Sequence, residues 1–287
     1  MTLMQVVTTR EELAEALSRL PSGPQRALVP TMGALHNAHA NLVRRACFEV
    51  QPDGAVVVSI FVNPRQFGPD EDLNRYPRPL ADDLELLAGL GADVVWTPTV
   101  DDMYPPGADI EAILPDSRGS VLEGASRPGH FAGVLTVVNL LFDAVQPGVA
   151  VFGEKDYQQL VLIRELARQR GDVRIVGAPL VRDSDGLALS SRNAYLSVED
   201  RRKALIIPQA IWTAQRIAMQ GGSADRAQRE ATAVFNGVYG VTPDYVVITD
   251  PELRPVSSAG PARILVAAVV GGVRLLDNAA LDLQGVH

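Results

Sequence analysis

Two of the four histidines, His36 and His39, lie three residues apart in the stretch PTMGALHNAHA (residues 30–40), directly after an apolar run. On a helix, side chains at this spacing share one face. Three interpretations of the pair are open: a zinc site, a group of hydrogen-bond donors for an anion at a helix N-terminus, or two surface residues that cap a first turn.

The zinc interpretation has the least support. No glutamate lies between the histidines as in an H-E-x-x-H motif. A third ligand, in addition, has to come from His130, His287 or a distant carboxylate. The anion interpretation needs only that a helix begins near His36, because its first N–H groups and its dipole then face the ligand. The histidine pair alone does not distinguish the anion interpretation from two surface residues that cap a first turn.

Two further motifs carry cations or hydroxyls suited to phosphate. GEKD (153–156) places Lys155 directly after an apolar run, and LSSRN (189–193) places Arg192 beside Ser190 and Ser191. A lysine is a point charge for phosphate, and arginine adds a fork of donors. Taken separately, a solvated lysine and an ordinary polar turn explain them equally well. The sequence has no Walker A or G-x-G-x-x-G motif, which argues against a P-loop kinase and a dinucleotide dehydrogenase.

The first 180 residues alternate between short β-branched runs and segments with helical spacing. This alternation predicts a parallel sheet covered on both faces, an α/β Rossmann-like domain. Ligands of such folds bind beyond the carboxyl ends of the strands, where PTMGALHNAH, residues 63–79 and GEKDYQQL fall. The predicted strands are 27–31, 55–61, 92–98, 149–153 and 173–177, and the predicted helices are 37–50, 79–90, 130–146 and 156–170.

After residue 180 the pattern changes to a polar loop, then helices, then strands. This order predicts a smaller α+β C-terminal domain over residues 181–287 beside the Rossmann-like domain of residues 1–180. The expected helical stretches are 198–219 and 223–237, and the expected strands are 244–250, 263–270 and 273–279.

Composition narrows the class of protein. The 287 residues are 47% hydrophobic and 21% charged, as in ordinary globular proteins. A net charge of −8 argues against general binding to nucleic acid or an anionic membrane. The single cysteine, Cys47, cannot form an internal disulfide, and we interpret it as a buried helix residue. Charged residues near the start argue against a signal peptide, and no apolar run is long enough for a membrane span, so we expect a cytoplasmic protein.

Five motifs together resemble the pantoate:β-alanine ligase family of the cytidylyltransferase-like superfamily. They are PTMGALH-x-x-H, FVNPRQF, RPGHFAGV, GEKDYQQL and LSSRN, and their order and spacing match the family from about residue 5 to 280. The resemblance implies an enzyme that uses ATP to join pantoate to β-alanine through a pantoyl-adenylate, with release of pyrophosphate and AMP. It also implies a homodimer.

The resemblance assigns the residues as follows. His36, His39 and Lys155 contact the ATP phosphates, and Ser190, Ser191 and Arg192 hold the outer phosphates. Gln66 and Gln159 hold pantoate, whereas Asn63 and Tyr76 frame the entry of β-alanine. His130 matches a family motif position, and we expect it to be structural or to support a residue that contacts the ligand. The remaining nucleotide contacts fall on Met32, Gly33, Gly153, Asp156, Val181 and Leu189.

Magnesium is implied as a bridge between the phosphates, and the family's metal carboxylates match Asp82 and Asp83. A first helical turn with two exposed carboxylates explains the same pair equally well.

The chain departs from the family at one position that bears on function. The family's H-x-G-H glycine, which lets the backbone approach adenine, is Ala38 here. Two alternatives to an active ligase therefore stay open: a ligand-binding homologue in which Ala38 has impaired catalysis, and another nucleotidyltransferase of the superfamily. The second does not account for FVNPRQF and the C-terminal domain together.

Overall fold

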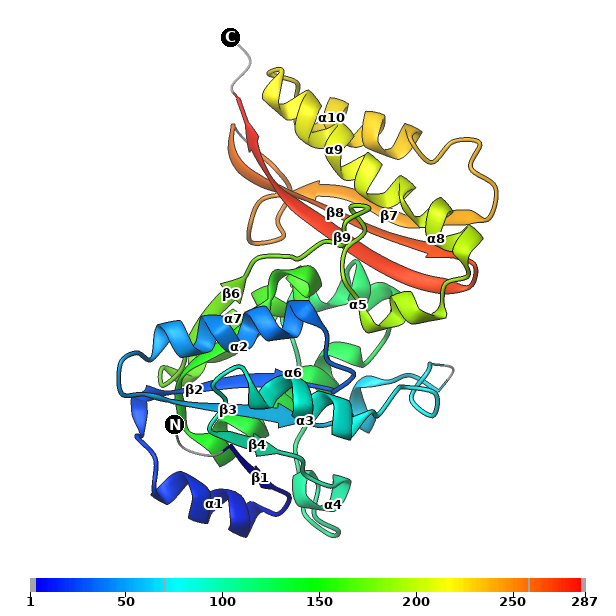
Figure 1. Cartoon of the computed structure of the whole chain (residues 1–287). Coiled ribbons are helices and arrows are strands. Elements are labelled where there is room, and N and C mark those ends of the chain that lie inside the picture. Colours follow the sequence, from blue (N-terminus) through cyan, green and yellow to red (C-terminus); the bar gives the residue numbers. More distant parts are fainter. Residues whose placement is uncertain (1–3, 70, 258, 285–287) are drawn as a thin grey trace. The chain divides into compact units, whose positions relative to one another are not determined.

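The computed structural model describes residues 4–69, 71–257 and 259–284. It divides into two compact units (Figure 1). The N-terminal unit contains the described residues up to Glu154 together with Gln158–Pro179. The C-terminal unit contains Lys155–Tyr157 and the described residues from Leu180 onward. Lys155 therefore packs with the C-terminal unit although it follows a strand of the N-terminal unit in the sequence.

The N-terminal unit is built on a parallel sheet with the strand order β1-β4-β3-β2-β5-β6. Each of the five predicted strands is confirmed, and the short β1 is an addition at one edge. β-branched residues, which suit a sheet buried on both faces, dominate β3 and β4. The strands are β1 (Gln5–Val7), β2 (Gly23–Thr31), β3 (Ala55–Ile60), β4 (Val94–Trp96), β5 (Pro147–Gly153) and β6 (Arg174–Ala178).

Helices cover this sheet on both faces, as in other Rossmann-like folds. Val43 of α2 and Leu87 of α3 pack with Val29, Val58 and Val151 of the strands in one buried cluster. Figure 1 shows α2 crossing in front of the sheet. The helices of this region are α1 (Arg10–Ser18), α2 (Asn37–Glu49), α3 (Leu80–Ala88), α4 (Val100–Met103), α5 (Glu123–Ser126), α6 (His130–Val145) and α7 (Tyr157–Arg170).

The strand order reverses between β2 and β5. From β2 the chain proceeds through β3 and β4 in one direction, and from β5 through β6 in the other. β2 and β5 are hydrogen-bonded neighbours, with Ala27 opposite Val149 and Leu28 opposite Ala150. Ligands of open α/β sheets bind at such a switch point, beyond the carboxyl ends of the strands. The segments that follow Thr31 at the end of β2 and Gly153 at the end of β5 start at this switch point.

The C-terminal unit is a three-stranded antiparallel sheet in the order β7-β8-β9, packed against helices. Ile264 and Val266 of the sheet share a buried cluster with Ile211 and Ala214 of α9. The predicted helical stretch 198–219 is divided at Leu205 into two helices. The elements are α8 (Val198–Ala204), α9 (Ile206–Met219), α10 (Ala224–Ala233), β7 (Val241–Thr249), β8 (Gly260–Val270) and β9 (Val273–Leu283).

Cys47 lies in α2, as predicted, but the expectation that it is buried is wrong, because it is partly exposed. Its Sγ lies 3.5 Å from the carbonyl oxygens of Leu90 and Gly91. The side chain therefore lies beside the turn after α3, at the margin of the buried cluster of the sheet.

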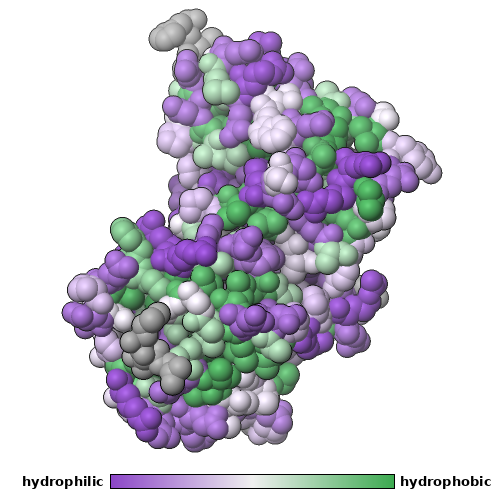
Figure 2. Space-filling view, viewed as in Figure 1, coloured by the Kyte–Doolittle hydropathy of each residue, from purple (hydrophilic) through white to green (hydrophobic). Residues whose placement is uncertain are grey.

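The surface mixes hydrophilic and apolar residues. Figure 2 shows apolar side chains gathered over the middle of the N-terminal unit on the face seen there. Phe48 and Leu114 are among the large apolar residues exposed on this unit, at 67% and 75%. None of the helices in the described ranges is long and apolar enough to cross a membrane.

Candidate functional site

The chain enters α2 through residues 32–36, with His36 as the N-cap. Nδ1 of His36 accepts the N–H of Ala38 at 3.3 Å, and the N–H of His36 donates to Nδ1 of His39 at 3.2 Å. The two ring centroids are 4.2 Å apart. A neutral imidazole that accepts at Nδ1 carries its proton on Nε2. Both rings are therefore Nε2–H donors at a helix N-terminus, where the dipole also favours an anion.

The turn before His36 is fixed by the buried carboxylate of Asp83, which is 2% exposed. Its Oδ2 accepts the N–H of Ala34 at 2.9 Å, and its Oδ1 accepts the N–H of Leu35 at 2.6 Å. Gly33 and Ala34 have φ values of +80° and +52°. A Cβ on Gly33 would lie 2.9 Å from Oδ2 of Asp83, so both the backbone and the close approach require glycine.

Asp82 and Asp83 differ in surroundings although they are neighbours in α3. Asp82 is exposed, which fits the expected exposed first turn, but that expectation is wrong for Asp83. Burial raises the pKa of Asp83, and the two N–H groups of the turn oppose this effect. The Asp83 carboxylate thus connects the start of α3 to the turn that carries His36.

Gln66 follows β3 in a short 3-10 helix, η1 (Pro64–Gln66), and is held by Asn63. The side-chain Nδ2 of Asn63 donates to Oε1 of Gln66 at 3.0 Å and to the carbonyl of Gly133 at 3.1 Å. Gln66 Nε2 in turn contacts Sδ of Met32. The amide of Gln66 therefore has a fixed orientation beside the histidine turn.

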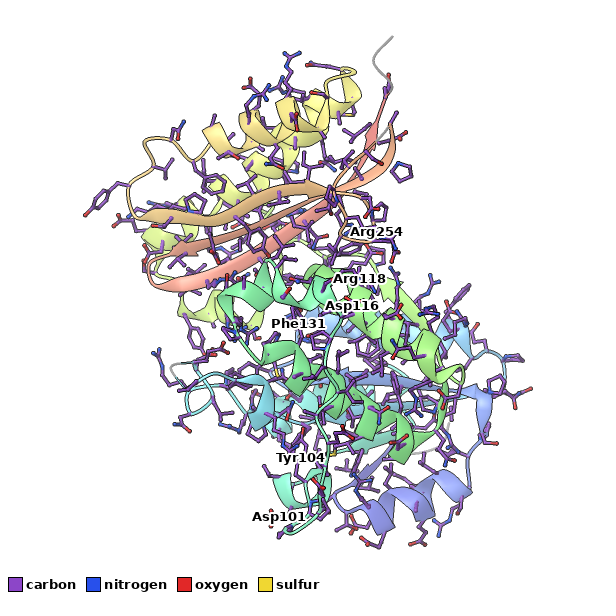
Figure 3. All side chains as sticks on the ribbon, turned by 180° about the vertical axis from the view of Figure 1, so that it is seen from behind. Asp101, Tyr104, Asp116, Arg118, Phe131 and Arg254 are labelled. Atoms are coloured by element: carbon purple, nitrogen blue, oxygen red, sulfur yellow. The ribbon has the colours of Figure 1, made fainter. Side chains whose placement is uncertain are left out.

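Tyr104, labelled in Figure 3 at the end of α4, completes this chain of hydrogen bonds. Its hydroxyl donates to Oδ1 of Asn63 at 2.8 Å, and the N–H of Arg65 donates to the same oxygen at 3.2 Å. Burial raises the pKa of Tyr104 to about 12, so the hydroxyl stays a donor at any physiological pH. Asn63 is 1% exposed and its side chain already makes four hydrogen bonds, so it acts on Gln66 rather than at an open surface.

His130, the first residue of α6, fixes the backbone of Gln66. Its Nδ1 lies 2.8 Å from the carbonyl oxygen of Gln66, and its Nε2 lies 3.0 Å from Nη1 of Arg127. Arg127 also forms a bidentate ion pair with Glu71, at 2.7 and 2.6 Å. Burial, reinforced by the Arg127 charge, lowers the pKa of His130 to about 4. The ring is therefore neutral and donates from Nδ1 to the carbonyl of Gln66, so it supports the backbone of Gln66.

The other expected residues of the N-terminal unit lie on separate elements. Tyr76 is buried and packs edge-to-face on Phe67, with ring centroids 5.9 Å apart. Gln159 in α7 is partly exposed, whereas the adjacent Gln158 is buried and bonded to Glu123, Arg118 and Val121. Of the two glutamines, Gln159 is therefore the one that is accessible to a ligand. Gly153 ends β5, opposite Ala178.

The remaining expected residues lie in the C-terminal unit. Lys155 has its Nζ 3.1 Å from Oδ1 of Asp156, and its side chain is 23% exposed. Ser190 caps the 3-10 helix η4 (Ser191–Tyr195), because its Oγ accepts the N–H of Arg192 at 3.3 Å. The N–H of Leu189 donates to the carbonyl of Val181 at 2.9 Å, so Val181 and Leu189 form the base of this loop.

The structure thus brings the expected residues together in two groups, one in each unit. Met32, Gly33, His36, His39, Asn63, Gln66 and Asp83 are joined by direct contacts or a shared turn in the N-terminal unit. Val181 and Leu189 support the Ser190–Arg192 loop in the C-terminal unit. Tyr104, Arg127 and Glu71 were missed, because an isolated tyrosine or an ion pair across a loop leaves no signature in a single sequence.

The described residues contain no group of three or more His, Cys, Asp or Glu side chains placed to hold a metal ion. The zinc interpretation of the histidine pair therefore has no third ligand there, and His287 lies outside the described residues. Magnesium is a different case, because it is commonly held by phosphate oxygens, water and only one or two carboxylates. Asp82 is an exposed oxygen donor that fits this requirement, whereas both oxygens of Asp83 already accept N–H groups.

Comparison with known proteins gives one consistent result. The family model described as pantoate-beta-alanine ligase matches residues 5–280. A pantothenate synthetase from a Nocardioides species is 54% identical, with 96% of this chain and 84% of that protein aligned. The pantothenate synthetase of Salinispora arenicola is 48% identical, with 98% and 99% aligned.

Solved structures agree with the sequence relatives. The pantothenate synthetase of Thermus thermophilus has a TM-score of 0.89 at 46% identity, with 96% of this chain and 99% of that chain covered. The pantoate-beta-alanine ligase of Francisella tularensis, complexed with beta-gamma ATP and beta-alanine, has a TM-score of 0.79 at 33% identity, with 96% and 97% covered.

Proposed function

The chain belongs to the pantoate-beta-alanine ligase family, and we propose that it condenses pantoate with β-alanine through a pantoyl-adenylate. The observation that carries the proposal is the histidine turn at the switch point between β2 and β5. Two Nε2–H donors and a helix N-terminus form an anion site there without a basic surface. The Francisella tularensis relative complexed with beta-gamma ATP and beta-alanine supports the same substrates for this chain.

In the first step, a carboxylate oxygen of pantoate attacks the α-phosphorus of ATP, and pyrophosphate leaves. Both reactants are anions and negative charge grows on the phosphate oxygens, so the reaction needs donors that are already in position. His36 and His39 supply hydrogen bonds from Nε2. Lys155 adds a positive charge, and Ser190, Ser191 and Arg192 hold the outer phosphates.

In the second step, the amine of β-alanine attacks the acyl carbon of the adenylate. The C–N bond forms, the nitrogen loses a proton, and AMP leaves with the oxygen that came from pantoate. No protein side chain is required as a nucleophile, so catalysis rests on positioning and charge. Gln66 and Gln159 hold pantoate, because an amide both donates to and accepts from a hydroxy acid. Tyr76 lies at the β-alanine entry.

The other nucleotide contacts are those that the family resemblance implies. Met32 and Gly33 lie in the histidine turn, Asp156 follows Lys155 directly, and Gly153 lies two residues before it. Val181 and Leu189 support the serine–arginine loop. We assign these six residues to the adenosine and ribose of ATP.

Magnesium would be held by the ATP phosphates with Asp82 as the protein ligand. When bound, it neutralises charge on the pyrophosphate that leaves. We assign Asp83 to the histidine turn rather than to the metal, because two backbone N–H groups already occupy its oxygens.

A homodimer and a cytoplasmic location complete the proposal. The exposed apolar side chains of the N-terminal unit, including Phe48 and Leu114, would be covered in a dimer through that unit. ATP as a substrate and a single cysteine both fit the cytoplasm.

The proposal is tested by omitting each substrate in turn from a reaction with Mg-ATP, pantoate and β-alanine. Pyrophosphate release should require pantoate, and pantothenate should form only when β-alanine is also present. Release without pantoate, or with a different acid only, would reject pantoate as the substrate.

A further inference from the structure

Lys155 is anchored to the C-terminal sheet by its backbone. The side-chain Nδ2 of Asn278 in β9 donates to the carbonyl oxygen of Lys155 at 2.9 Å. The hydroxyl of Tyr157 donates to the carbonyl of Pro251 at 3.0 Å, and the guanidinium of Arg263 lies 3.7 Å from the centre of the Tyr157 ring. These contacts explain why Lys155–Tyr157 pack with the C-terminal unit.

Asn278 is itself held rigidly. It is 4% exposed and lies opposite Leu265 in an unbroken antiparallel pairing of β8 with β9. Nη1 of Arg263 donates to its Oδ1, so that oxygen faces the arginine and the Nδ2 group faces Lys155. The orientation of the amide is therefore determined by charge, and rotation would break both hydrogen bonds.

The preceding residue, Asp277, holds the serine–arginine loop from the same strand. Its carboxylate forms a bidentate ion pair with Arg182, at 2.6 and 2.8 Å, and its side chain is 1% exposed. Arg182 Nη1 also donates to the carbonyl of Gly186 at 3.0 Å. The backbone of Arg182 bridges to Ala188, directly before Leu189.

We infer that Asp277 and Asn278 are a pair of positioning residues that hold the two cationic segments of the ATP site, Lys155 and the Ser190–Arg192 loop, in a fixed register on β9. Asp277 and Asn278 are consecutive in a regularly paired strand, which fixes their spacing, so a single strand supports both segments. A transition state that gains charge needs such preorganisation, because donors that must first be ordered lose most of their effect. The inference rests on the proposed role of these segments in binding ATP phosphates.

Two isosteric variants separate the two anchors. Asn278→Asp keeps an acceptor for Arg263 but replaces the donor to Lys155 with an oxygen that repels its carbonyl. Asp277→Asn keeps the shape but removes the charge that pairs with Arg182. Asp244→Asn is the matched control, because it breaks the ion pair of Asp244 with Arg274, at 2.6 Å on the same sheet, without touching Lys155 or the loop.

Kinetics of pyrophosphate release provide the main readout. Misplacement of a catalytic group by about 1 Å can cost ~10²-fold in rate. We expect Asn278→Asp and Asp277→Asn to lower kcat for adenylate formation about 10- to 100-fold, while the KM for β-alanine stays within about twofold of the wild type, consistent with an effect confined to the phosphate groups. Asp244→Asn should leave all parameters within about twofold.

Hydrogen exchange on the full-length chain, measured by mass spectrometry, gives a second readout that is independent of activity. Asn278→Asp should accelerate exchange in the peptide that contains Lys155, and Asp277→Asn should accelerate exchange over residues 186–193. Faster exchange with unchanged kcat would overturn the inference, as would two variants that match Asp244→Asn in both readouts. A wild-type protein that forms no pantothenate would reject the proposed function instead, and the Mg-ATP affinity of the same variants would then decide the role of the anchors.

Discussion

The backbone N–H of His36 donates to Nδ1 of His39 at 3.2 Å, so the second histidine of the pair closes the first turn of the helix that carries both. The same contact fixes the protonated nitrogen of His39 as Nε2. His39 therefore caps the helix, and in the proposed function the same side chain also donates to an anion.

Substitution of His39 separates these functions. His39→Asn keeps an acceptor for the N–H of His36 but removes the Nε2 donor, so we expect kcat to fall about 10²- to 10³-fold with little loss of stability. His39→Ala also loses the cap, so its free energy of unfolding should be about 1 kcal/mol lower than that of His39→Asn. Steady-state pyrophosphate release and urea unfolding of both variants check this. Equal stability of the two variants would contradict the capping role.

Asp83→Asn should reduce activity through the turn and not through the metal. One of the two N–H groups of Ala34 and Leu35 loses its acceptor, which costs about 1–3 kcal/mol of stability. Half-maximal Mg²⁺ should stay unchanged for Asp83→Asn but rise for Asp82→Asn, as a titration of activity against Mg²⁺ measures. Combining Asp83→Asn with Ala34→Gly, which relieves the positive φ, should recover part of the loss. An increased Mg²⁺ requirement for Asp83→Asn would instead make it a ligand.

Tyr104→Phe removes one donor to Asn63 and leaves the ring packing intact. We expect a loss of about 1 kcal/mol in stability and a KM for pantoate several-fold higher, since Asn63 orients Gln66. The KM for ATP should not change, which gives an internal control within the same kinetic experiment. Unchanged KM for pantoate would show that Asn63 needs no support from Tyr104.

His130 predicts a specific dependence of stability on pH. Burial holds its folded pKa at about 4, below its ordinary value, so between that ordinary value near 6.5 and pH 4 the unfolded chain binds the proton and the folded chain does not. The free energy of unfolding should therefore fall by up to about 3 kcal/mol as the pH drops from about 6.5 to about 4. Below about pH 4 His130 is protonated in both states and makes no further difference.

Urea unfolding across this range, with His130→Asn as the comparison, measures the effect. The asparagine amide can still donate to the carbonyl of Gln66, but it does not titrate. The variant should therefore show a flatter dependence between about pH 6.5 and about pH 4. Parallel pH profiles for the two proteins would mean that His130 is not the source.

Ala38 is compatible with the structure as it stands. It is the second residue of α2, has no positive φ, and its N–H serves the His36 cap. We expect Ala38→Gly to cost about 1 kcal/mol in helix stability while the KM for ATP changes less than about threefold. An inactive wild type that Ala38→Gly restores would support the impaired homologue instead. Isothermal titration with Mg-ATP on both proteins makes the comparison direct.

The alternation of apolar runs and helical segments was sufficient to predict the parallel sheet, because a short β-branched run such as β3 is typical of a strand buried on both faces. The break at Leu205 was missed because both sides keep helical spacing, although Pro208, which lies in the first turn of α9, is a signal for a helix start. The histidine turn was visible as a motif, but its support was not. Asp83 lies 48 residues beyond Leu35, and Asn278 lies 123 residues beyond Lys155, so only the folded chain reveals these contacts.

The path of one oxygen atom tests the central claim most directly. Pantoate labelled with ¹⁸O in both carboxylate oxygens is turned over with Mg-ATP and β-alanine, and the products are analysed by mass spectrometry. A pantoyl-adenylate intermediate requires one label in AMP and the other in the amide carbonyl of pantothenate. Label in inorganic phosphate, with ADP as the nucleotide product, would contradict the adenylate and point to activation by phosphoryl transfer.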